Sequence, residues 1–560
     1  MSFVCHGTWR VLAALAGAAL LTACATPGNV VDVHLVALND FHGNLEASTF
    51  RYASFDDHEK HVVKAGGVDT LAAALNEWRR EDGQLLLVGA GDLVGASPPL
   101  SSMWADEPSI EALNGLGLRV SSVGNHEFDA GRVELLRQQN GGCDSPRPGK
   151  ACRFEKPFVG AHFTYLAANV IDKASGKPIL PAYRIEQAHG VKIAFIGAVL
   201  KDTVSMVTPD GIAGLEFIDE ADAINGVLPE LRAQGVHAFV VLIHQGGHTD
   251  EAPDLPDCQH LQGPIVDVVK RLDPEIRLIV SGHTHTGYTC RVDGRVVTQA
   301  DMGGHLLTRI RLSVDTQTDT VLDVAAKNAV MLPDSYPPDA AMQVYLERVQ
   351  RRSAAELARP VAHLGTALVT RQINAAGESA FGDLVADSML FATRGNGAQI
   401  AFINSGGLCE DLEADSAGVV NEAQVRAALP FGNTLVTMSF SGAQLRELLD
   451  GQGRGAAHAG PLQVSQGLSY RWDEGAPSGS RVRDLRLGGV PVEDGKTYRV
   501  TVNNFLAQGG DHFAMFTKGG ERVDSGVNDV EALKRYLADC DAKGMPAGAA
   551  QPGARIVGKQ

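Results

Sequence analysis

The chain has 560 residues, of which 44% are hydrophobic, and this length predicts at least two large domains and excludes a single core. Its 66 acidic and 49 basic residues give a formal net charge of -17, which excludes the binding of nucleic acid polymers through a basic surface. An anionic substrate would be repelled by the protein at large, so its site needs a local positive charge, such as bound divalent ions.

The N-terminal residues 1–23 have the pattern of an export signal. Arg10 precedes an apolar run over residues 11–21, which is too short to span a membrane as a helix. Residues 21–24, Leu-Thr-Ala-Cys, resemble a bacterial lipobox, which predicts that Cys24 is lipidated and anchors a periplasm-facing chain to a membrane. The alternative is a plain secretory signal that contains a cysteine, and in both cases the chain is exported.

The remaining cysteines agree with export, because an even number in an oxidising compartment favours disulfides. The predicted pairs are Cys143–Cys152, Cys258–Cys290 and Cys409–Cys540. Cys143 and Cys152 flank a loop rich in glycine and proline, whereas the pair Cys409–Cys540 follows only by elimination.

Strand-like segments alternate with helix-like ones in the first half of the chain, which predicts an α/β domain over residues 31–335. The expected strands are 31–38, 84–88, 120–123, 191–196, 237–243 and 276–280, and the expected helices are 68–80 and 109–116. Folds of this kind bind ligands at the carboxyl ends of their strands.

Polar side chains of metal-binding type follow five of these strands. They are Asp40 and His42, then Asp92, then Asn125 and His126, then His244, and finally His283 and His285. Imidazoles and carboxylates in this mixture suit zinc, manganese or iron. A lone carboxylate such as Asp92 can bridge two ions, and two ions can clamp the attacking and leaving oxygens of a displacement at phosphorus. Each motif alone is common in turns, but five in one order along one domain predict a two-metal phosphoesterase.

The second half of the chain has a different organisation. Residues 336–360 form a linker whose charged, glycine-free part, 339–357, is predicted to be a stiff helix. A second α/β region is expected over residues 361–535, with polar and aromatic loops in place of core patterns at 404–407, 430–433 and 503–511. The tail over residues 541–560 is rich in glycine, alanine and proline and is expected to be loose.

The order of the motifs, Asp-x-His, Gly-Asp, Gly-Asn-His-Glu, His and Gly-His-x-His, resembles that of the calcineurin-like metallophosphoesterases. Over roughly residues 31 to 530 the chain resembles the 5'-nucleotidases, in which this domain precedes a dedicated substrate domain. The resemblance implies an α/β protein with an N-terminal β-sandwich flanked by helices, a helical linker and a second α/β domain that binds substrate.

The resemblance also implies roles for the motif residues. One divalent ion, zinc, manganese or similar, would be held by Asp40, His42, Asp92 and His285, and a second by Asp92, Asn125, His244 and His283. His126 would stabilise the charge that develops on the phosphate, and Asp129 would orient its imidazole.

On the substrate side, the resemblance assigns Phe431 and Phe505 to the two faces of a nucleobase, because aromatic rings stack on any base. The polar contacts to base, ribose or phosphate would come from Arg371, Asn404, Asn433 and Asp511. The sequence departs from the family pattern at two positions, where Ala375 and Cys409 stand in place of arginines. The loss of two bidentate anion contacts leaves the preferred substrate open.

Three kinds of function therefore remain. The first is a hydrolase that releases phosphate from extracytoplasmic nucleotides. The second applies the same chemistry to another ester: a 2',3'-cyclic nucleotide, a 3'-nucleotide, a nucleotide sugar or a sulfur-containing anion. The third, from a different class, is a lipoprotein that binds nucleotides without turning them over, although a pure binder has no need of the His126 and Asp129 pair.

Overall fold

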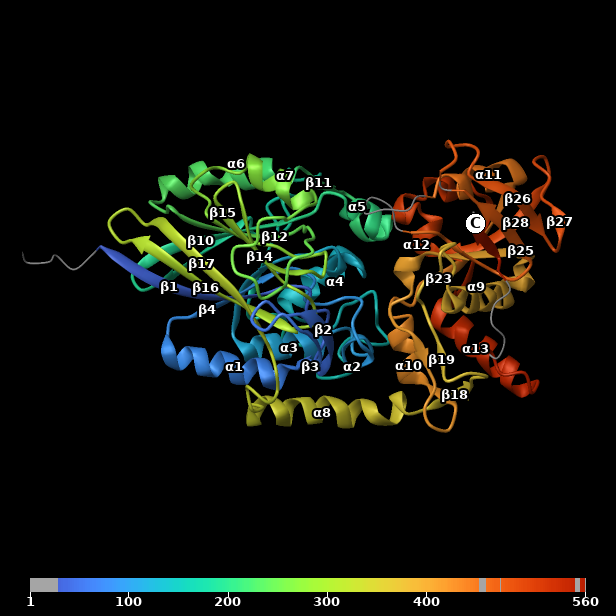
Figure 1. The fold of residues 1–560 in the computed structure, drawn as a ribbon, viewed down its shortest axis with the longest axis horizontal. Coiled ribbons are helices and arrows are strands. Elements are labelled where there is room, and N and C mark those ends of the chain that lie inside the picture. Colours follow the sequence, from blue (N-terminus) through green and yellow to red (C-terminus); the bar gives the residue numbers. More distant parts are fainter. Residues whose placement is uncertain (1–28, 453–459, 474, 549–553, 559–560) are drawn as a thin grey trace, which may run out of the picture.

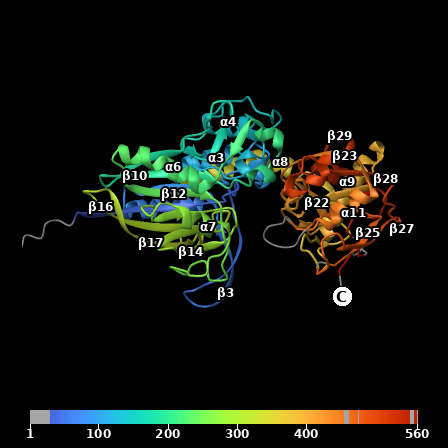
Figure 2. The same cartoon turned by 90° about the horizontal axis from the view of Figure 1, so that it is seen from above.

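The computed structural model describes residues 29–452, 460–473, 475–548 and 554–558. It consists of two lobes, and one long helix runs along the first of them toward the second (Figure 1); a view turned by 90° shows the same two lobes side by side (Figure 2). The predicted signal segment and the lipidation site at Cys24 lie outside the described residues. Within the described ranges, no helix has both the length and the apolar character needed to cross a membrane.

The first lobe is built on two six-stranded sheets whose central strands run parallel. The first sheet has the order β17 (Thr320–Val330), β16 (Leu306–Asp315), β1 (Val30–Leu38), β4 (Leu86–Ala90), β5 (Leu118–Ser122) and β6 (Thr164–Leu166). The second has the order β14 (Gly287–Val292), β15 (Arg295–Ala300), β13 (Leu278–Val280), β12 (Ala238–His244), β10 (Val191–Val199) and β9 (Tyr183–Ala188).

The alternation of side chains along each strand explains why the two sheets pack face to face. In β1, Val33 and Leu35 point into a core shared with the second sheet, whereas Val36 and Leu38 point to the opposite face. Because both faces are apolar, each sheet also needs a cover of helices. The first sheet is covered by α1 (Val68–Glu81), α3 (Glu107–Leu116) and α8 (Ala340–Leu357), and the second by α6 (Glu220–Ala233) and α7 (Pro264–Arg271). The result is the predicted β-sandwich flanked by helices.

Helix α8 belongs structurally to the first lobe, although it was predicted as a linker. It begins after Asp339, whose side chain accepts a hydrogen bond from the backbone N–H of Met342. Met342 and Val349 pack into the core of the first lobe, and the Trp104 Nε1 donates to the Ser353 hydroxyl at 2.9 Å. The helix runs along the edge of the first lobe (Figure 1), so the connection between the lobes is only the short segment before β18 (Pro360–His363).

The second lobe contains a five-stranded and a four-stranded sheet. The five-stranded sheet has the order β24 (Gln463–Val464), β20 (Ile400–Ile403), β28 (Thr497–Asn503), β23 (Thr434–Ser441) and β29 (Gly520–Asn528). The four-stranded sheet has the order β27 (Val490–Pro491), β26 (Val482–Leu487), β25 (Leu468–Trp472) and β30 (Ile556–Gly558). Helices α9 (Ala380–Thr393) and α13 (Asp529–Ala542) cover one face of the larger sheet, and α11 (Gly442–Asp450) covers the other. This lobe is the expected second α/β domain.

Two of the three predicted disulfides are present, Cys143–Cys152 and Cys258–Cys290. The third prediction was wrong, because Cys409 and Cys540 are free thiols. Elimination was the only argument for that pair, and the fold separates its members. Cys409 lies in a loop whose backbone N–H donates to the carbonyl of Ala428, whereas Cys540 lies on α13.

The expectation of a loose tail was also wrong for its described C-terminal end. Residues Ile556–Gly558 form β30, which pairs in parallel with β25. The preceding Arg555 binds Asp387 through both terminal nitrogens, at 2.8 and 2.9 Å, and its Nε lies 3.4 Å from the Asp383 carboxylate. The Arg555 backbone N–H donates to Glu378 at 2.7 Å. The tail therefore closes an acidic patch inside the second lobe.

We expect Arg555→Gln to destabilise the second lobe in a pH-dependent way. Burial, with help from neighbouring carboxylates, raises the pKa of Asp383 to about 8, while Arg555 opposes that rise. A carboxyl with a raised folded-state pKa loses its stabilising contribution as the pH rises from about 4 to about 8. Without Arg555 this loss grows, so the variant should lose about 3–5 kcal/mol at pH 9 and clearly less at pH 5.

Thermal unfolding at both pH values would measure this difference. The matched control is Arg535→Gln, because Arg535 is half-exposed and pairs with Glu531 on the surface of α13 at 2.9 Å. That variant should lose less than about 1 kcal/mol. Equal losses for the two variants, or a loss at Arg555 that does not depend on pH, would contradict the role given to the tail.

Candidate metal centre and substrate cavity

The fold brings the predicted metal ligands together at one edge of the sandwich. Each follows or ends a parallel strand: Asp40 and His42 follow β1, Asp92 follows β4, Asn125 follows β5, His244 ends β12, and His283 and His285 follow β13. Their donor atoms form two groups, each with all atoms within 4.8 Å of one another. One group is Asp40, His42 and His285, and the other is Asp92, His244 and His283.

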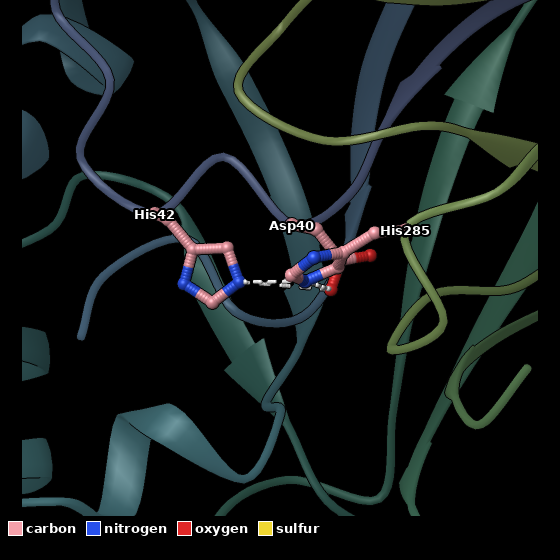
Figure 3. A group of neighbouring side chains, drawn as sticks. All are labelled: Asp40, His42 and His285. Carbon is pink, nitrogen blue, oxygen red and sulfur yellow. Dashed lines mark hydrogen bonds and ion pairs between the residues drawn. The ribbon is translucent and has the colours of Figure 1, made fainter. Parts of the chain in front are cut away.

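In the first group the three side chains point toward one another (Figure 3). The Nε2 atoms of His42 and His285 are 3.1 Å apart, and the His285 Nε2 lies 3.3 Å from Asp40 Oδ1. In the second group, the His283 Nδ1 lies 3.1 Å from the amide oxygen of Asn125. Asn125 therefore joins the second group, as the predicted ligand set requires.

Asp92 lies between the two groups. Its Oδ1 accepts a hydrogen bond from the backbone N–H of His126 at 2.9 Å, which fixes the carboxylate. Its Oδ2 lies 2.9 Å from His244 Nε2 and 3.7 Å from His42 Nε2. Burial alone would raise the pKa of Asp92, but His244 and His126 outweigh it and hold that pKa well below the ordinary value. One ionised carboxylate thus faces both groups, as a bridging ligand does.

The donor atoms fit cations. His42 and His244 each turn Nδ1 to a backbone carbonyl, of Gly95 and Ala90 respectively, at 2.8 Å, so each imidazole presents Nε2 to the site. Burial lowers the pKa of His42 and of His283 to about 4, so both rings are neutral at pH 7. His244 differs from them, because Asp92 and Asp40 outweigh burial and raise its pKa to about 9, so in the protein alone its Nε2 carries a proton beside Asp92. A divalent ion that binds between these imidazoles and carboxylates would take the place of that proton.

The backbone of the ligand loops is strained. Five of the predicted ligands have a left-handed backbone with positive φ, which costs of the order of 1–3 kcal/mol for a residue other than glycine. They are Asp40, His42, Asp92, His283 and His285, with φ between 46° and 78°. The neighbouring glycines leave no room for side chains, because a Cβ on Gly124 would collide with Asp92 and one on Gly282 would lie 2.7 Å from the carbonyl of Ala90. The surrounding sandwich holds these loops in place.

Glu127 ties two of these loops together, and the sequence reasoning missed it. Its carboxylate accepts hydrogen bonds from the backbone N–H groups of Asp92 at 2.9 Å, Leu93 at 2.8 Å and Gly124 at 2.5 Å. Burial, with a further contribution from Asp92, raises the pKa of Glu127 to about 7. Glu127 belongs to the Gly-Asn-His-Glu motif. The sequence around it does not show that its carboxylate is buried and accepts hydrogen bonds from the backbone of a neighbouring loop.

His126 and Asp129 form the predicted pair. The His126 Nδ1 lies 2.8 Å from Asp129 Oδ2, which orients the ring. Burial alone would lower the pKa of His126, but Asp129 and Asp92 outweigh it and raise that pKa to about 10. The ring is therefore a cation at neutral pH in the protein alone, and bound metal ions would oppose this charge. The centroid of the His126 ring lies 5.8 Å from that of Phe431, with nearly parallel planes, so the second lobe reaches the loop that carries His126.

A cavity of about 330 Å³ lies between the lobes and extends from the predicted metal ligands to the predicted substrate residues. From the first lobe it is lined by Asn125, His126, Asp129 and His283, and from the second by Asn404, Phe431, Asn433, Phe505 and Asp511. The Asn404 amide donates to Asp511 at 2.7 Å, so these two side chains hold one another. Gly510 is required here, because a Cβ would lie 2.5 Å from the ring of Phe505.

Arg371 lies outside this lining. Its guanidinium donates to the backbone carbonyl of Leu408 at 3.1 Å, and its backbone N–H donates to Asp411. Burial raises the pKa of the nearby Cys409 thiol to about 12, so that side chain is neutral. The basic residues that do line the cavity are Arg147 and Lys150, from the loop closed by the Cys143–Cys152 disulfide. The sequence indicated the loop but gave no sign that it reaches the substrate cavity.

Comparisons with known proteins agree with this arrangement. Residues 33–287 match the calcineurin-like phosphoesterase family, and residues 360–518 match the 5'-nucleotidase C-terminal domain. Endonuclease YhcR of Bacillus subtilis is 31% identical over 520 residues, which are 92% of this chain, and the chain spans only 40% of that protein. A 5'-nucleotidase of Vibrio cholerae is 24% identical over 565 residues, or 94% of each chain. A 5'-nucleotidase precursor from Thermus thermophilus has a crystal structure with a TM-score of 0.75, 27% identity and coverage of 94% of this chain and 99% of that one.

The first lobe is that of a metal-dependent phosphoester hydrolase of the calcineurin-like class, which explains why its strand ends gather two sets of metal ligands. The second match narrows this class, since it covers the lobe that carries Phe431 and Phe505. The chain belongs to the 5'-nucleotidase family, with the phosphoesterase domain first and the C-terminal domain second.

Proposed function

We propose that the protein is an exported 5'-nucleotidase, which releases phosphate from extracytoplasmic nucleotides with two divalent ions, zinc, manganese or similar. The observation that carries the proposal is that one cavity between the lobes is lined both by the predicted metal ligands Asn125 and His283 and by Phe431 and Phe505. A nucleotide needs both ends of such a site, because its phosphate ester and its base lie at opposite ends of the molecule.

We assign the metal ligands and the proton donor of the reaction to the following residues. Asp40, His42, Asp92 and His285 would hold one ion, and Asp92, Asn125, His244 and His283 the other. The ions would supply the positive charge that polarises a phosphoryl oxygen and makes water acidic enough to attack near neutral pH. His126, oriented by Asp129, donates a hydrogen bond to the phosphate as its negative charge increases and then to the leaving oxygen.

The second lobe positions the nucleoside. Phe431 and Phe505 stack on the base, a contact that all bases can make. Asn404, Asn433 and Asp511 bind the polar edges of the base and ribose. The two lobes contribute different parts of one site, so the substrate domain sets which ester reaches the ions.

Two features support a location outside the cytoplasm. The two disulfides suit an oxidising compartment, and the N-terminal segment has the pattern of a signal with a lipobox at Cys24. We propose that the protein is anchored through Cys24 and faces the periplasm.

A panel of phosphate esters tests the function. Protein reloaded with Mn²⁺ would be given AMP, 2',3'-cyclic AMP, 3'-AMP and a nucleotide sugar at neutral pH. Released phosphate would be measured directly for the two monoesters, and after treatment with a phosphomonoesterase for the cyclic ester and the sugar, whose first hydrolysis gives a monoester. We expect AMP to have the highest kcat/KM. A higher value for a cyclic or 3' ester, or for the sugar, would assign the same chemistry to another substrate. Bound metal without turnover of any ester would instead indicate a nucleotide-binding lipoprotein.

A further inference from the structure

A second cavity of about 320 Å³ adjoins the substrate cavity at the boundary between the lobes. The two cavities border the same five residues, namely Ser102, Arg147, Lys150, Pro430 and Phe431. Apart from Glu531, the charged residues that line the second cavity are basic: Arg147, Lys150, Arg426 and Lys534. A ligand that extends from the metal centre past Phe431 would enter a basic recess.

Three of the four basic side chains are already neutralised. Arg147 pairs with Glu134 at 2.7 Å and with Asp106 at 3.2 Å. Arg426 and Lys534 both pair with Glu422, at 3.0 and 2.5 Å. Lys150 differs from them, because it forms no ion pair with any residue in the described part of the chain.

The disulfide loop holds Lys150 in place from several sides. The Cys143–Cys152 bond closes the loop, and the Cys152 backbone N–H donates to Glu107 at 2.7 Å. The Ser145 hydroxyl donates to Glu134 at 2.6 Å, and the Lys150 N–H donates to the carbonyl of Arg147 at 2.9 Å. Because the backbone is fixed, Lys150 stays at the wall of both cavities, and contact with a ligand has to order only its side chain.

The electrostatic surroundings of Lys150 favour an anion. Burial lowers the pKa of Lys150, the guanidinium groups of Arg147 and Arg426 lower it further, and Asp106 only partly opposes them. A half-buried ammonium beside two guanidinium groups is stabilised by an anion that contacts it. The chain supplies no carboxylate for this purpose among its described residues, whereas a phosphorylated substrate would.

We propose that Lys150, with Arg147 behind it, forms a subsite for a second phosphate group of the substrate, beyond the phosphate that the metal ions bind. The proposal rests on the proposed nucleotide-hydrolysing function and adds to it a residue that selects among nucleotides. Such a subsite would supply basic contacts from the first lobe, where Ala375 and Cys409 on the second lobe stand in place of arginines. The second phosphate has two possible sources, a diphosphate or a separate phosphate linked through the ribose.

The test compares Lys150→Gln with the wild-type protein on four substrates. AMP carries one phosphate, ADP carries a diphosphate, and adenosine 3',5'-bisphosphate and the dinucleotide pApA carry a second phosphate through the ribose. A charge-assisted hydrogen bond contributes about 1.5–3 kcal/mol, so KM for the matching substrates should rise about tenfold or more. KM for AMP should change less than about twofold, and Lys150→Arg should restore most of the binding.

Lys173→Gln is the matched control, since Lys173 is an exposed lysine of the same lobe outside both cavities. A selective rise with ADP alone would assign the subsite to a diphosphate, and one with the other two substrates would assign it to a phosphate on the ribose. An equal rise for AMP, or no change for any substrate, would overturn the proposal. If the wild-type protein hydrolysed none of the four while holding metal, the proposed function itself would fall, and the subsite with it.

Discussion

Asp92→Asn is expected to remove most bound metal and to lower kcat for phosphate release by roughly 10³-fold or more. The reason is geometric, because one oxygen of the Asp92 carboxylate faces both ligand groups, at 2.9 Å from His244 Nε2 and 3.7 Å from His42 Nε2. An amide of the same shape keeps the hydrogen bond from His126 or a close substitute, but it removes the negative charge between two cations. Metal content per protein, measured by mass spectrometry after gel filtration, and initial rates of phosphate release would report both effects.

The matched control for this variant is Asp254→Asn. Asp254 is also a buried aspartate of the first lobe, and it accepts hydrogen bonds from Ser54 and from the backbone N–H of Phe55 at 2.8 and 2.7 Å. It should retain two equivalents of metal even if it unfolds at a lower temperature. Retention of two equivalents by the Asp92 variant would contradict a bridging carboxylate, and equal metal loss in both variants would indicate a general loss of folding.

His126→Ala is expected to retain both metal equivalents but to lower kcat by roughly 10²–10⁴-fold, because its ring acts on the phosphate and not on the ions. The ring lines the substrate cavity, and its Nδ1 is occupied by Asp129 at 2.8 Å. The exposed His162 provides a control, since His162→Ala should leave metal content and kcat unchanged. Full activity of the His126 variant would contradict the role assigned to the imidazole.

The proposed role of His126 also predicts how kcat changes with pH. Burial opposes the charge on His126, but Asp129 and Asp92 raise its pKa to about 10, and bound cations would bring it down again. The protonated ring is the form that donates a hydrogen bond to the phosphate. Activity should therefore fall as the pH rises through the pKa that His126 has in the metal-loaded protein. Asp129→Asn removes the main charge that raises the pKa, and the alkaline fall in kcat should therefore move to lower pH. A profile that stays in place would show that another group controls it.

The metal centre could be predicted from the sequence because its chemistry is local. A strand that ends in a polar pair such as Asp40 and His42 is visible in a few residues, and parallel strands bring their carboxyl ends to one edge. The same reasoning predicted a helix over residues 339–357, which agrees with the observed Ala340–Leu357, because a charged, glycine-free helical pattern is also a local feature. What the pattern did not show is that this helix packs on the first lobe.

The features that the sequence reasoning missed or misplaced depend on contacts between distant segments. Glu127 holds the loop that carries Asp92, and Arg555 meets Asp387 across 168 residues. Arg371 was expected at the substrate, but its guanidinium donates to a backbone carbonyl. Charged side chains have no periodicity that reveals their partners, so only the fold shows which of them support a site and which reach a ligand.

The crowded glycines set a limit for anyone who wishes to make this enzyme more robust. Replacing glycine with alanine is a common way to stiffen a loop, since it reduces the freedom of the unfolded chain. At Gly124 and Gly282 the added methyl group would strike Asp92 or the carbonyl of Ala90, so heat resistance gained there would come with a damaged ion site. At Gly142 and Gly190 nothing lies within 4 Å of the added atom, but both residues have positive φ, which disfavours alanine. The better targets are glycines that have both free space and a negative φ, such as Gly226 in α6.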